Sequence, residues 1–454
     1  MVADPARALA EHVCRIGFED LPATTREATR RDILDTFGCM LGGSGSPGIS
    51  EVARVLRRWG GIGESRVVLG GRMPAAQAAL LNASMGHALD FDDTLDHGGS
   101  IHPGVSVLAA SLAVADRLGG ISGRELMLAV ALGLDVSCRI ALAATLDRGW
   151  HRTAAIGVFG ATVAAGKLLA LSPSQMEHAL GIAYSHAAGN RQCIVDGALT
   201  KRLQAGQAAG SAVFAAELAA EGFTGAENIF LGKFGFFELY QPNGYDAALL
   251  THELGVRFRG EELSFKPYPC GRPLHATLDA AMALHKELGL ADGATLASIK
   301  IATDPATYAE NFENAGHKRK PRQIVEAQFA LPFLVAAALV HGRVGIGEVS
   351  AIDDAVVLAL AARIEGRAVA GAAKSWAQVT VRRADGRHAM IETTAPLGSP
   401  ENPLGVEQLE RKFADCAANA VRPIAPARVA AATAAILDLE SMADVGDLLG
   451  DIAA

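Results

Sequence analysis

The residues best able to do chemistry gather between positions 86 and 104. The segment GHALDFDDT (86–94) carries three carboxylates, and His102 follows it closely. Asp90, Asp93 and Thr94 are spaced i, i+3 and i+4, so they share one face if a helix continues through them. Carboxylates are disfavoured at a helix C-terminus, and conflicts of this kind are tolerated mainly where they serve function. We interpret the cluster as a candidate site. The alternative is a solvated turn whose aspartates cap nearby backbone.

The position of His102 indicates a general base. Pro103 suits the first position of a helix, so His102 is predicted at or just before the start of a helix over 103–118. Free N–H groups there attract anions, and their positive field lowers the pKa of an adjacent imidazole. A neutral histidine beside a bound anion can accept a proton from it. The alternative is an ordinary exposed histidine.

Two further predicted helices also begin next to basic side chains. His151 stands just before a helix of small residues over 153–170, and Lys201 stands just before a helix over 203–221. The small residues in both helices let neighbouring helices approach closely. Together with His102, these positions suggest that separate helix N-termini converge on one anionic ligand.

A strap rich in proline, FKPYPCGRPLH (265–275), follows the helical part of the chain. Its three prolines and its glycine predict an ordered but irregular path. Lys266 and Arg272 are both suited to carboxylate recognition, and Arg272 can do so through two parallel hydrogen bonds. Cys270 could be a nucleophile, but we interpret it as a small buried residue. His275 is consistent with a helix N-terminal residue.

These side chains must be positioned by a mainly helical chain. Apolar residues recur at three- and four-residue spacing in many segments, which predicts helices over 5–20, 25–42, 74–89, 103–118, 122–146, 153–170, 173–188, 203–221, 275–289, 321–341, 406–418 and 425–439. Alternation predicts a strand over 297–303 and a β-hairpin from 377–383 and 388–394. We therefore predict a large all-helical bundle domain over 1–265, to which 400–454 returns, and an inserted smaller α+β lid domain over 266–399.

Composition narrows the class of protein. The 454 residues are 50% hydrophobic and 20% charged, enough for a large core, and the net charge of −8 argues against nucleic-acid binding. The N-terminus does not resemble a signal peptide. The longest apolar stretch, 126–145, is interrupted by Asp135 and Arg139, so no membrane span is expected. Six scattered cysteines indicate reduced thiols, and we expect a cytoplasmic protein.

Several other kinds of site have little support. The sequence has no CxxC pair, no glycine-rich nucleotide loop after a strand, no GxSxG and no HExxH. Residues that could together ligate a divalent metal are Asp90, Asp92, Asp93, His97 and His102. No second ligand cluster accompanies them. We therefore expect neither a metal nor a cofactor.

These motifs resemble the MmgE/PrpD family, which includes 2-methylcitrate dehydratase, cis-aconitate decarboxylase and iminodisuccinate epimerase. The most specific match is HALDFDDT followed by HPG, supported in order along nearly the whole chain by GWHRTAAIGVFGA, TK before a helix, KPYPCGRPLH and ENPLGVEQLERKF. The resemblance implies a helical domain with a smaller α+β lid, a homodimer, and metal-free chemistry on small di- and tricarboxylates in the cleft between domains. Carried over by motif, its site residues are Asp90, Thr94, His102, His151, Lys201 and Lys266.

The chain also departs from the family pattern. The usual K-P-x-H-x-G is here KRLQAG, so Gln204 replaces a histidine. Gly271 stands where decarboxylase members have a histidine, Phe333 stands where they have a tyrosine, and the spacing from Thr94 to His102 is longer than theirs. These departures argue against decarboxylation of cis-aconitate. Arg202 and Arg272 could hold a different pattern of carboxylates.

The sequence therefore predicts proton abstraction next to a carboxylate. The predicted catalytic residues are His102 as base, His151 as its acid partner, and Asp90 and Thr94 as orienting groups. The predicted substrate-binding residues are Lys201, Lys266, Arg272 and Gln204. We favour a hydro-lyase acting on a hydroxy acid that resembles 2-methylcitrate. The alternatives are an epimerase of a substituted dicarboxylate and a carboxylate-binding protein without catalytic activity.

Overall fold

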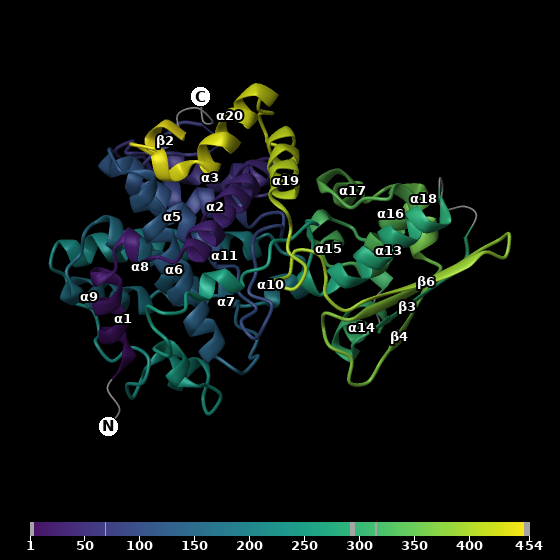
Figure 1. The fold of residues 1–454 in the computed structure, drawn as a ribbon, viewed down its shortest axis with the longest axis horizontal. Coiled ribbons are helices and arrows are strands. Elements are labelled where there is room, and N and C mark those ends of the chain that lie inside the picture. The colour runs from purple at the N-terminus through teal and green to yellow at the C-terminus, as the bar shows by residue number, and fades with distance from the viewer. Residues whose placement is uncertain (1–3, 69, 291–295, 314–315, 449–454) are drawn as a thin grey trace.

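The computed structural model describes residues 4–68, 70–290, 296–313 and 316–448, and it is mainly helical (Figure 1). A larger helical part holds most of the chain, and a smaller part carries a four-stranded sheet. The helices of the larger part are α1 (Pro5–Arg15), α2 (Ala23–Gly43), α3 (Ile49–Trp59), α4 (Ala75–Gly86), α5 (Pro103–Leu118), α6 (Gly123–Ala143), α7 (Arg152–Ala155), α8 (Gly157–Leu168), α9 (Pro173–Tyr184), α10 (Gln192–Val195), α11 (Thr200–Ala220) and α12 (Phe236–Tyr240). A two-residue ribbon, β1 (Ser65–Arg66) with β2 (Arg72–Met73), lies among them.

The smaller part, here called the sheet unit (residues 272–393), mixes helices and strands. Its helices are α13 (His275–Leu288), α14 (Pro305–Phe312), α15 (Ile324–Ala327), α16 (Leu331–His341), α17 (Ile346–Ser350) and α18 (Ala355–Ala361). Its strands β3 (Leu296–Thr303), β4 (Ile364–Ala368), β5 (Ala377–Arg383) and β6 (His388–Thr393) pair in the order β4-β3-β5-β6. Strand β4 runs parallel to β3, and the other pairs are antiparallel. The predicted strand and hairpin are confirmed.

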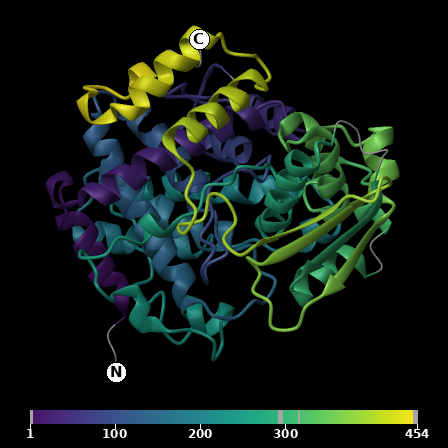
Figure 2. The same cartoon turned by 45° about the vertical axis from the view of Figure 1, so that its right-hand side comes forward.

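The chain returns to the larger part at its C-terminal end. Helices α19 (Val406–Ala418) and α20 (Pro426–Leu437) both pack on α2, and the two views agree on this placement (Figures 1 and 2). Residues from Leu404 to Leu448 accordingly join the same hydrophobic core as the N-terminal helices, whereas the sheet unit has a core of its own. The exact domain boundaries and the role of the sheet unit as a lid stay predictions.

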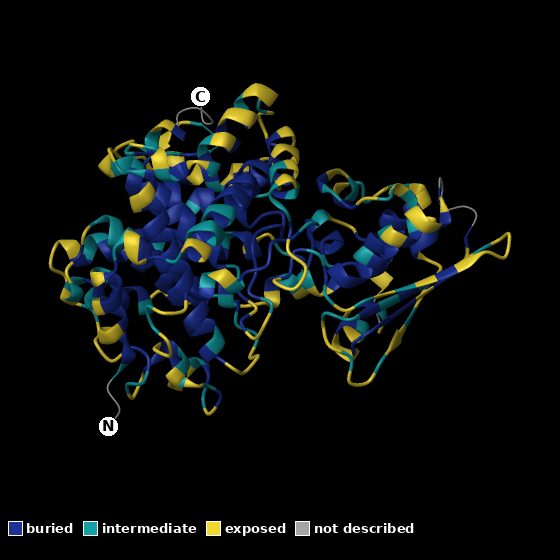
Figure 3. Ribbon diagram, viewed as in Figure 1, coloured by how far each residue is buried: buried dark blue, intermediate teal, exposed yellow. Residues whose placement is uncertain are grey.

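Burial explains why so many helices are apolar all round. The middle of the helical part is dark blue in Figure 3, with small residues of α5, α6, α8 and α11 fully enclosed. Helix α6 is long and apolar enough to cross a membrane, but 94% of that window is buried inside the protein. Burial by other helices accounts for such a pattern. Asp135 and Arg139, which interrupt the apolar stretch, pair with each other on α6 at 2.8 Å.

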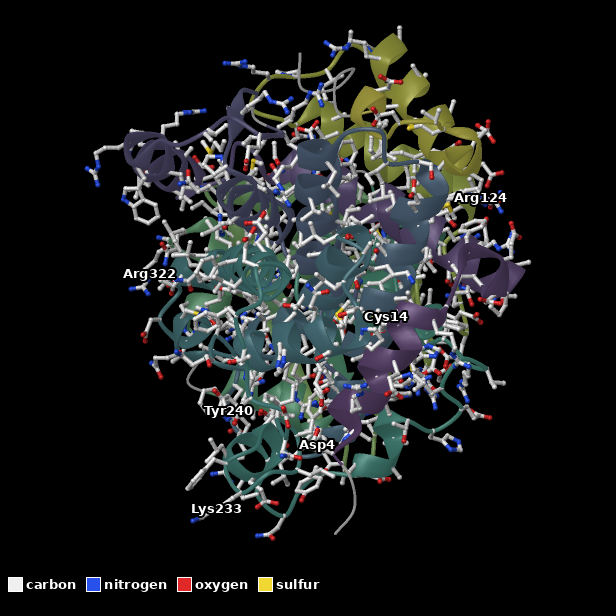
Figure 4. All side chains as sticks on the ribbon, turned by 90° about the vertical axis from the view of Figure 1, so that its left-hand side faces the viewer. Asp4, Cys14, Arg124, Lys233, Tyr240 and Arg322 are labelled. Atoms are coloured by element: carbon white, nitrogen blue, oxygen red, sulfur yellow. The ribbon has the colours of Figure 1, made fainter. Side chains whose placement is uncertain are left out.

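Polar caps fix the ends of several helices. Asp4 accepts the N–H of Ala6 at the start of α1 and also the N–H groups of Phe230 and Leu231 (Figure 4). Serine side chains accept N–H groups at the starts of α6 and α9, as is typical of N-caps. The serine caps are local, whereas the Asp4 contacts also attach the start of α1 to residues 230–231.

The structure differs from the predicted secondary structure in several places. The predicted helix over 74–89 ends at Gly86, so no helix continues through Asp90 and Thr94 and their shared face does not exist. The predicted helix over 321–341 is broken into α15 and α16, because Pro332 starts a new helix. The predicted single helix over 153–170 is divided into α7 and α8. The elements that were not predicted are helices α3, α10, α12, α14, α17 and α18 and strands β1, β2 and β4. The starts of helices α5 and α7, directly after His102 and His151, are confirmed.

Candidate active site

The candidate site is built on the irregular segment that joins α4 to α5. Asp90 lies in this segment with a φ of 53°, a left-handed conformation that aspartate tolerates better than most residues. This turn lies in the irregular segment that follows the end of α4 at Gly86. It leaves both the backbone carbonyl and the carboxylate of Asp90 available to side chains that arrive from other elements.

Two lysines meet at Asp90. Lys201, in the first turn of α11, donates to Oδ1 of Asp90 at 2.6 Å. Lys266, fully buried, donates to the Asp90 carbonyl at 2.9 Å and lies 3.2 Å from Oδ2. Burial alone would raise the pKa of Asp90, but the ammonium groups of Lys201 and Lys266 hold that pKa well below its usual value. One carboxylate between two ammonium groups leaves an excess of positive charge for an anionic ligand.

His87, which was not among the predicted site residues, lies at the centre of the site. Its Nδ1 is 2.7 Å from Oδ2 of Asp92, and its Nε2 is 2.8 Å from Nζ of Lys201. An ammonium group can only donate, so Nε2 accepts and the ring proton is on Nδ1. Burial, and then the charge of Lys201, lower the pKa of His87 well below its usual value. Its place within the GHALDFDDT segment was the one signal that could have identified it.

His102 has a free ring nitrogen. Its Nδ1 is 2.5 Å from the carbonyl oxygen of Asp93, which can only accept, so Nδ1 carries the proton and Nε2 has an unshared electron pair. Burial, followed by the charge of Lys266, lowers the pKa of His102 to about 3. The imidazole is therefore neutral at physiological pH. Its ring centre is 5.1 Å from that of His87.

His151 approaches from the start of α7. Its Nε2 lies 3.3 Å from Nε2 of His87, and its Nδ1 lies 3.2 Å from Oε1 of Gln204. Burial, and then the neighbouring His87, lower the pKa of His151 well below its usual value. Gln204 is itself oriented by Asn190, because its Oε1 accepts the Asn190 N–H and its Nε2 donates to the Asn190 carbonyl. These contacts place Gln204 behind His151, and its direct contact with substrate stays a prediction.

Arg272 lies at the edge of the cluster, at the start of the sheet unit. Its Nε donates to Asp96 at 2.8 Å, and its Nη1 donates to the Leu397 carbonyl at 2.9 Å. Its Nη2 is buried and has no hydrogen-bond partner in the described part of the chain. A buried donor without a partner is costly, and a carboxylate ligand would satisfy it.

Thr94 connects the two halves of the site. Its backbone pairs with Ser264 through two hydrogen bonds of 2.9 and 2.8 Å, which attaches the segment after Asp90 to the segment that leads into Lys266. Cys270 is fully buried, and burial raises the pKa of its thiol, in agreement with its interpretation as a buried residue. Arg202 donates to the Pro47 carbonyl, and burial lowers its pKa to about 10.

The structure thus brings together His102, His151, Lys201, Lys266 and Asp90 around His87. Gln204 and Arg272 border this group. Within residues 4–68, 70–290, 296–313 and 316–448, no group of three or more histidines, cysteines or carboxylates is arranged to hold a metal ion. The carboxylate of Asp90 faces ammonium groups instead.

A second layer of buried carboxylates lies behind the histidines. Asp93 accepts the N–H of Gly104 at the start of α5, and a Cβ on Gly104 would come within 2.7–2.8 Å of oxygens of Asp32, Thr36 and Asp93. Burial, then neighbouring carboxylates, raise the pKa of both Asp32 and Asp93 well above its usual value. The carboxyl groups of Asp32 and Asp93 therefore keep a proton to a higher pH than an exposed carboxyl group does. Only glycine fits at position 104.

The raised pKa values of Asp32 and Asp93 should make the free energy of unfolding depend on pH. A pKa raised in the folded state adds stability that is lost as pH rises above the unfolded value of about 4. We expect Asp32→Asn, which removes one of the two carboxyl groups and its repulsion of Asp93, to flatten that loss. Each pKa unit between the folded and unfolded states is worth about 1.4 kcal/mol. Urea denaturation across a series of pH values would measure this loss, and parallel curves for the variant and the wild type would contradict the raised pKa of Asp32.

Comparison with known proteins gives matches over most of the chain. Residues 7–248 match the model of the MmgE/PrpD N-terminal domain, and residues 268–439 match that of the MmgE/PrpD C-terminal domain. A cis-aconitate decarboxylase-like protein of Aspergillus oryzae is 26% identical, over 97% of this chain and 95% of its own length. The cis-aconitate decarboxylase of Aspergillus terreus is 26% identical over 95% and 92%, and that of Homo sapiens 26% over 89% and 86%.

Proposed function

The chain belongs to the MmgE/PrpD family, and from that premise we propose that it is a lyase acting on a small di- or tricarboxylate. The reaction begins with removal of a proton from the carbon next to a carboxylate. The observation that carries the proposal is His102, a neutral imidazole whose Nδ1 is held by the Asp93 carbonyl and whose Nε2 is free to accept a proton. A base needs this protonation state at the working pH.

The positive charge around Asp90 supports the same step. Proton removal next to a carboxylate creates an enediolate, whose added negative charge must be stabilised. Lys201 and Lys266 are fixed by Asp90 at 2.6 and 2.9 Å, so their charges are in place before the substrate arrives. Donors that need no rearrangement are the most effective at stabilising such a transition state. Nη2 of Arg272, which has no hydrogen-bond partner among the described residues, would bind a second carboxylate.

Loss of water is the lyase reaction that we favour. His102 takes the carbon-bound proton, the electron pair forms the new double bond, and the hydroxyl leaves as water with a proton from His151. Thr94 and Asp90 border the leaving group in this proposal. The substrate class that fits is a hydroxylated tricarboxylate, such as 2-methylcitrate.

Decarboxylation is the second candidate, and the names of the relatives favour it. It would break a carbon–carbon bond and release CO2 without loss of water. Position 271, which is a histidine in decarboxylase members of the family, is glycine here. A Cβ at Gly271 would lie 2.9 Å from the ring of Phe329, so this ring occupies the space that a side chain at 271 would need.

Gly271→Ala tests that packing directly. We expect the variant to lose about 1–3 kcal/mol of stability, because the added methyl group must displace Phe329. The centre of the Phe329 ring lies 5.8 Å from Nζ of Lys201. Because Lys201 is a proposed substrate-binding residue, displacement of this ring should also raise KM. Pairing Gly271→Ala with Phe329→Leu should restore part of the stability in denaturant unfolding. A single variant as stable as the wild type would show that the ring moves without cost.

One set of assays distinguishes the candidate reactions. The purified protein is incubated with 2-methylcitrate, citrate and cis-aconitate, and three signals are followed. We expect a rise in ultraviolet absorbance from a conjugated double bond, the product of water loss. Release of CO2 would instead identify a decarboxylase, and hydrogen exchange with D2O without net loss of substrate would identify an epimerase. Absence of all three signals on these substrates would contradict the proposal.

A further inference from the structure

Lys412 belongs to a sequence motif that the proposed function does not use, ENPLGVEQLERKF (401–413). It lies in helix α19 and is buried. Its Nζ donates to Oδ1 of Asp35 at 2.6 Å and to the backbone carbonyl of Phe91 at 2.6 Å, and it lies 3.9 Å from the centre of the Phe91 ring. The bond to the carbonyl reaches the candidate site, because Phe91 stands between Asp90 and Asp92.

Two buried lysines hold two consecutive peptide groups of this segment. Lys266 donates to the carbonyl of Asp90 at 2.9 Å, and Lys412 donates to the next carbonyl along the chain, that of Phe91. The turn at Asp90 is strained, since its φ is 53°. A left-handed residue other than glycine persists only where its surroundings determine the conformation. Each lysine fixes one peptide plane, so removal of either frees one end of the turn.

The peptide group that Lys412 holds leads directly to the acceptors of two histidines. Oδ2 of Asp92 is 2.7 Å from Nδ1 of His87, and the carbonyl oxygen of Asp93 is 2.5 Å from Nδ1 of His102. Rotation of the peptide group between Phe91 and Asp92 would move both acceptors. The orientation of both imidazoles therefore depends on a side chain from the C-terminal end of the chain.

Helix α19 does not need Lys412 in order to pack on α2. The ring of Phe413 stacks on that of Phe37 with their centres 6.3 Å apart, and a Cβ at Gly38 would lie 3.1 Å from the Phe413 ring. Leu409 and Cys416 of α19 are also buried. A buried ion pair contributes little to stability compared with apolar packing. The ammonium group of Lys412 therefore indicates a role beyond joining the two helices.

We propose that Lys412 is a positioning residue of the candidate active site. By holding the Phe91 carbonyl, it fixes the turn at Asp90 and the directions of the acceptors for His87 and His102. Lys412 itself makes no contact with the substrate. The inference rests on the proposed function for the reaction that Lys412 serves, whereas the geometry that it holds belongs to the ligand-free chain.

A pair of variants isolates the bond to the carbonyl. Lys412→Met alone would leave the buried carboxylate of Asp35 without its cation and lower stability for that reason. Asp35→Asn is therefore the reference, because asparagine keeps an oxygen that accepts from Lys412. Lys412→Met combined with Asp35→Asn differs from this reference by the ammonium group alone. Arg411→Met, at the neighbouring exposed position of the same helix, is the surface control.

The first measurement needs no substrate. Imidazole protons in short hydrogen bonds resonate far downfield in NMR spectra of protein with 15N-labelled histidine, and His87→Gln and His102→Gln assign the two signals. We expect Asp35→Asn and Arg411→Met to keep both signals downfield and the double variant to move both upfield. Urea unfolding verifies that the double variant is folded. Unchanged signals in the folded double variant, or the same change in Asp35→Asn alone, would overturn the inference.

The second measurement uses the substrate that the assays identify. We expect kcat of the double variant to be about 10²-fold below that of Asp35→Asn, the cost of a small misplacement of catalytic groups. KM should change less, because Lys201 and Arg272 are carried by other elements. Equal kcat in the two variants would overturn the inference.

The outcomes also separate this inference from the proposed function. Upfield movement of both signals in the double variant, without turnover of any substrate by the wild type, would leave the positioning role of Lys412 standing and contradict the lyase. Turnover by the wild type, with signals and kcat unchanged in the double variant, would do the reverse.

Discussion

His102→Gln lowers kcat/KM by about 10²–10⁴-fold, the usual worth of a general base, and leaves the fold intact. The helix that follows does not depend on the imidazole, because Pro103 starts α5 and the His102 side chain makes no capping hydrogen bond to it. The amide of glutamine can still donate to the Asp93 carbonyl in place of Nδ1. What is lost is the free Nε2. Steady-state kinetics on the substrate that the assays identify would measure the effect.

A histidine outside the site provides the matched control. His388 is exposed on strand β6, so His388→Gln should leave both kinetics and thermal stability unchanged. The pH profile adds a second measurement. Because the pKa of His102 is lowered to about 3, the base stays deprotonated throughout the neutral range. Wild-type turnover by His102→Gln would remove this residue from the mechanism.

Arg139→Met has the largest expected effect on stability, a loss of about 3–5 kcal/mol. Arg139 is fully buried on α6 and donates to Asp135 at 2.8 Å and to the carbonyls of His252 and Arg257 at 2.7 and 2.6 Å. Methionine fills much of the space but donates nothing. The variant therefore leaves a buried carboxylate and two carbonyls without their donor.

Denaturant unfolding measures this loss against a surface control. Arg148 is exposed, so Arg148→Met should change stability by no more than about 0.5 kcal/mol. Adding Asp135→Asn to Arg139→Met removes the unpaired carboxylate and should recover part of the loss. Equal stability of Arg139→Met and the wild type would show that the buried pair contributes nothing beyond its packing.

Much of the candidate site could be predicted from patterns that are local in sequence. A proline after His102 and a run of small residues after His151 marked two helix starts, because helix ends have strong residue preferences. The hairpin followed from alternation around Asp385 and Gly386. The sequence also predicted that basic side chains from distant segments lie near one anion site. In the structure, Lys201 and Lys266 both contact Asp90.

The remaining features depend on contacts between distant segments. No local pattern indicated that the chain leaves the helix at Gly86, since this path is fixed by lysines from positions 201 and 266. His87 was overlooked for the same reason. It lies within a helical apolar pattern, and its partners Lys201 and His151 come from other helices. Residue periodicity reports which face is buried, but not which polar groups meet inside.

The segment from Ala88 to Asp96 receives donors from both sides of the molecule. Gln328 and Arg272 of the sheet unit bind the Ala88 carbonyl and the Asp96 carboxylate, while Lys201 of the helical part binds Asp90. A chimeric protein that combines parts of two family members must therefore preserve these contacts. A sheet unit transplanted from a relative would fold around its own core, yet it would assemble a working catalyst only if residues 88–96 were exchanged along with it.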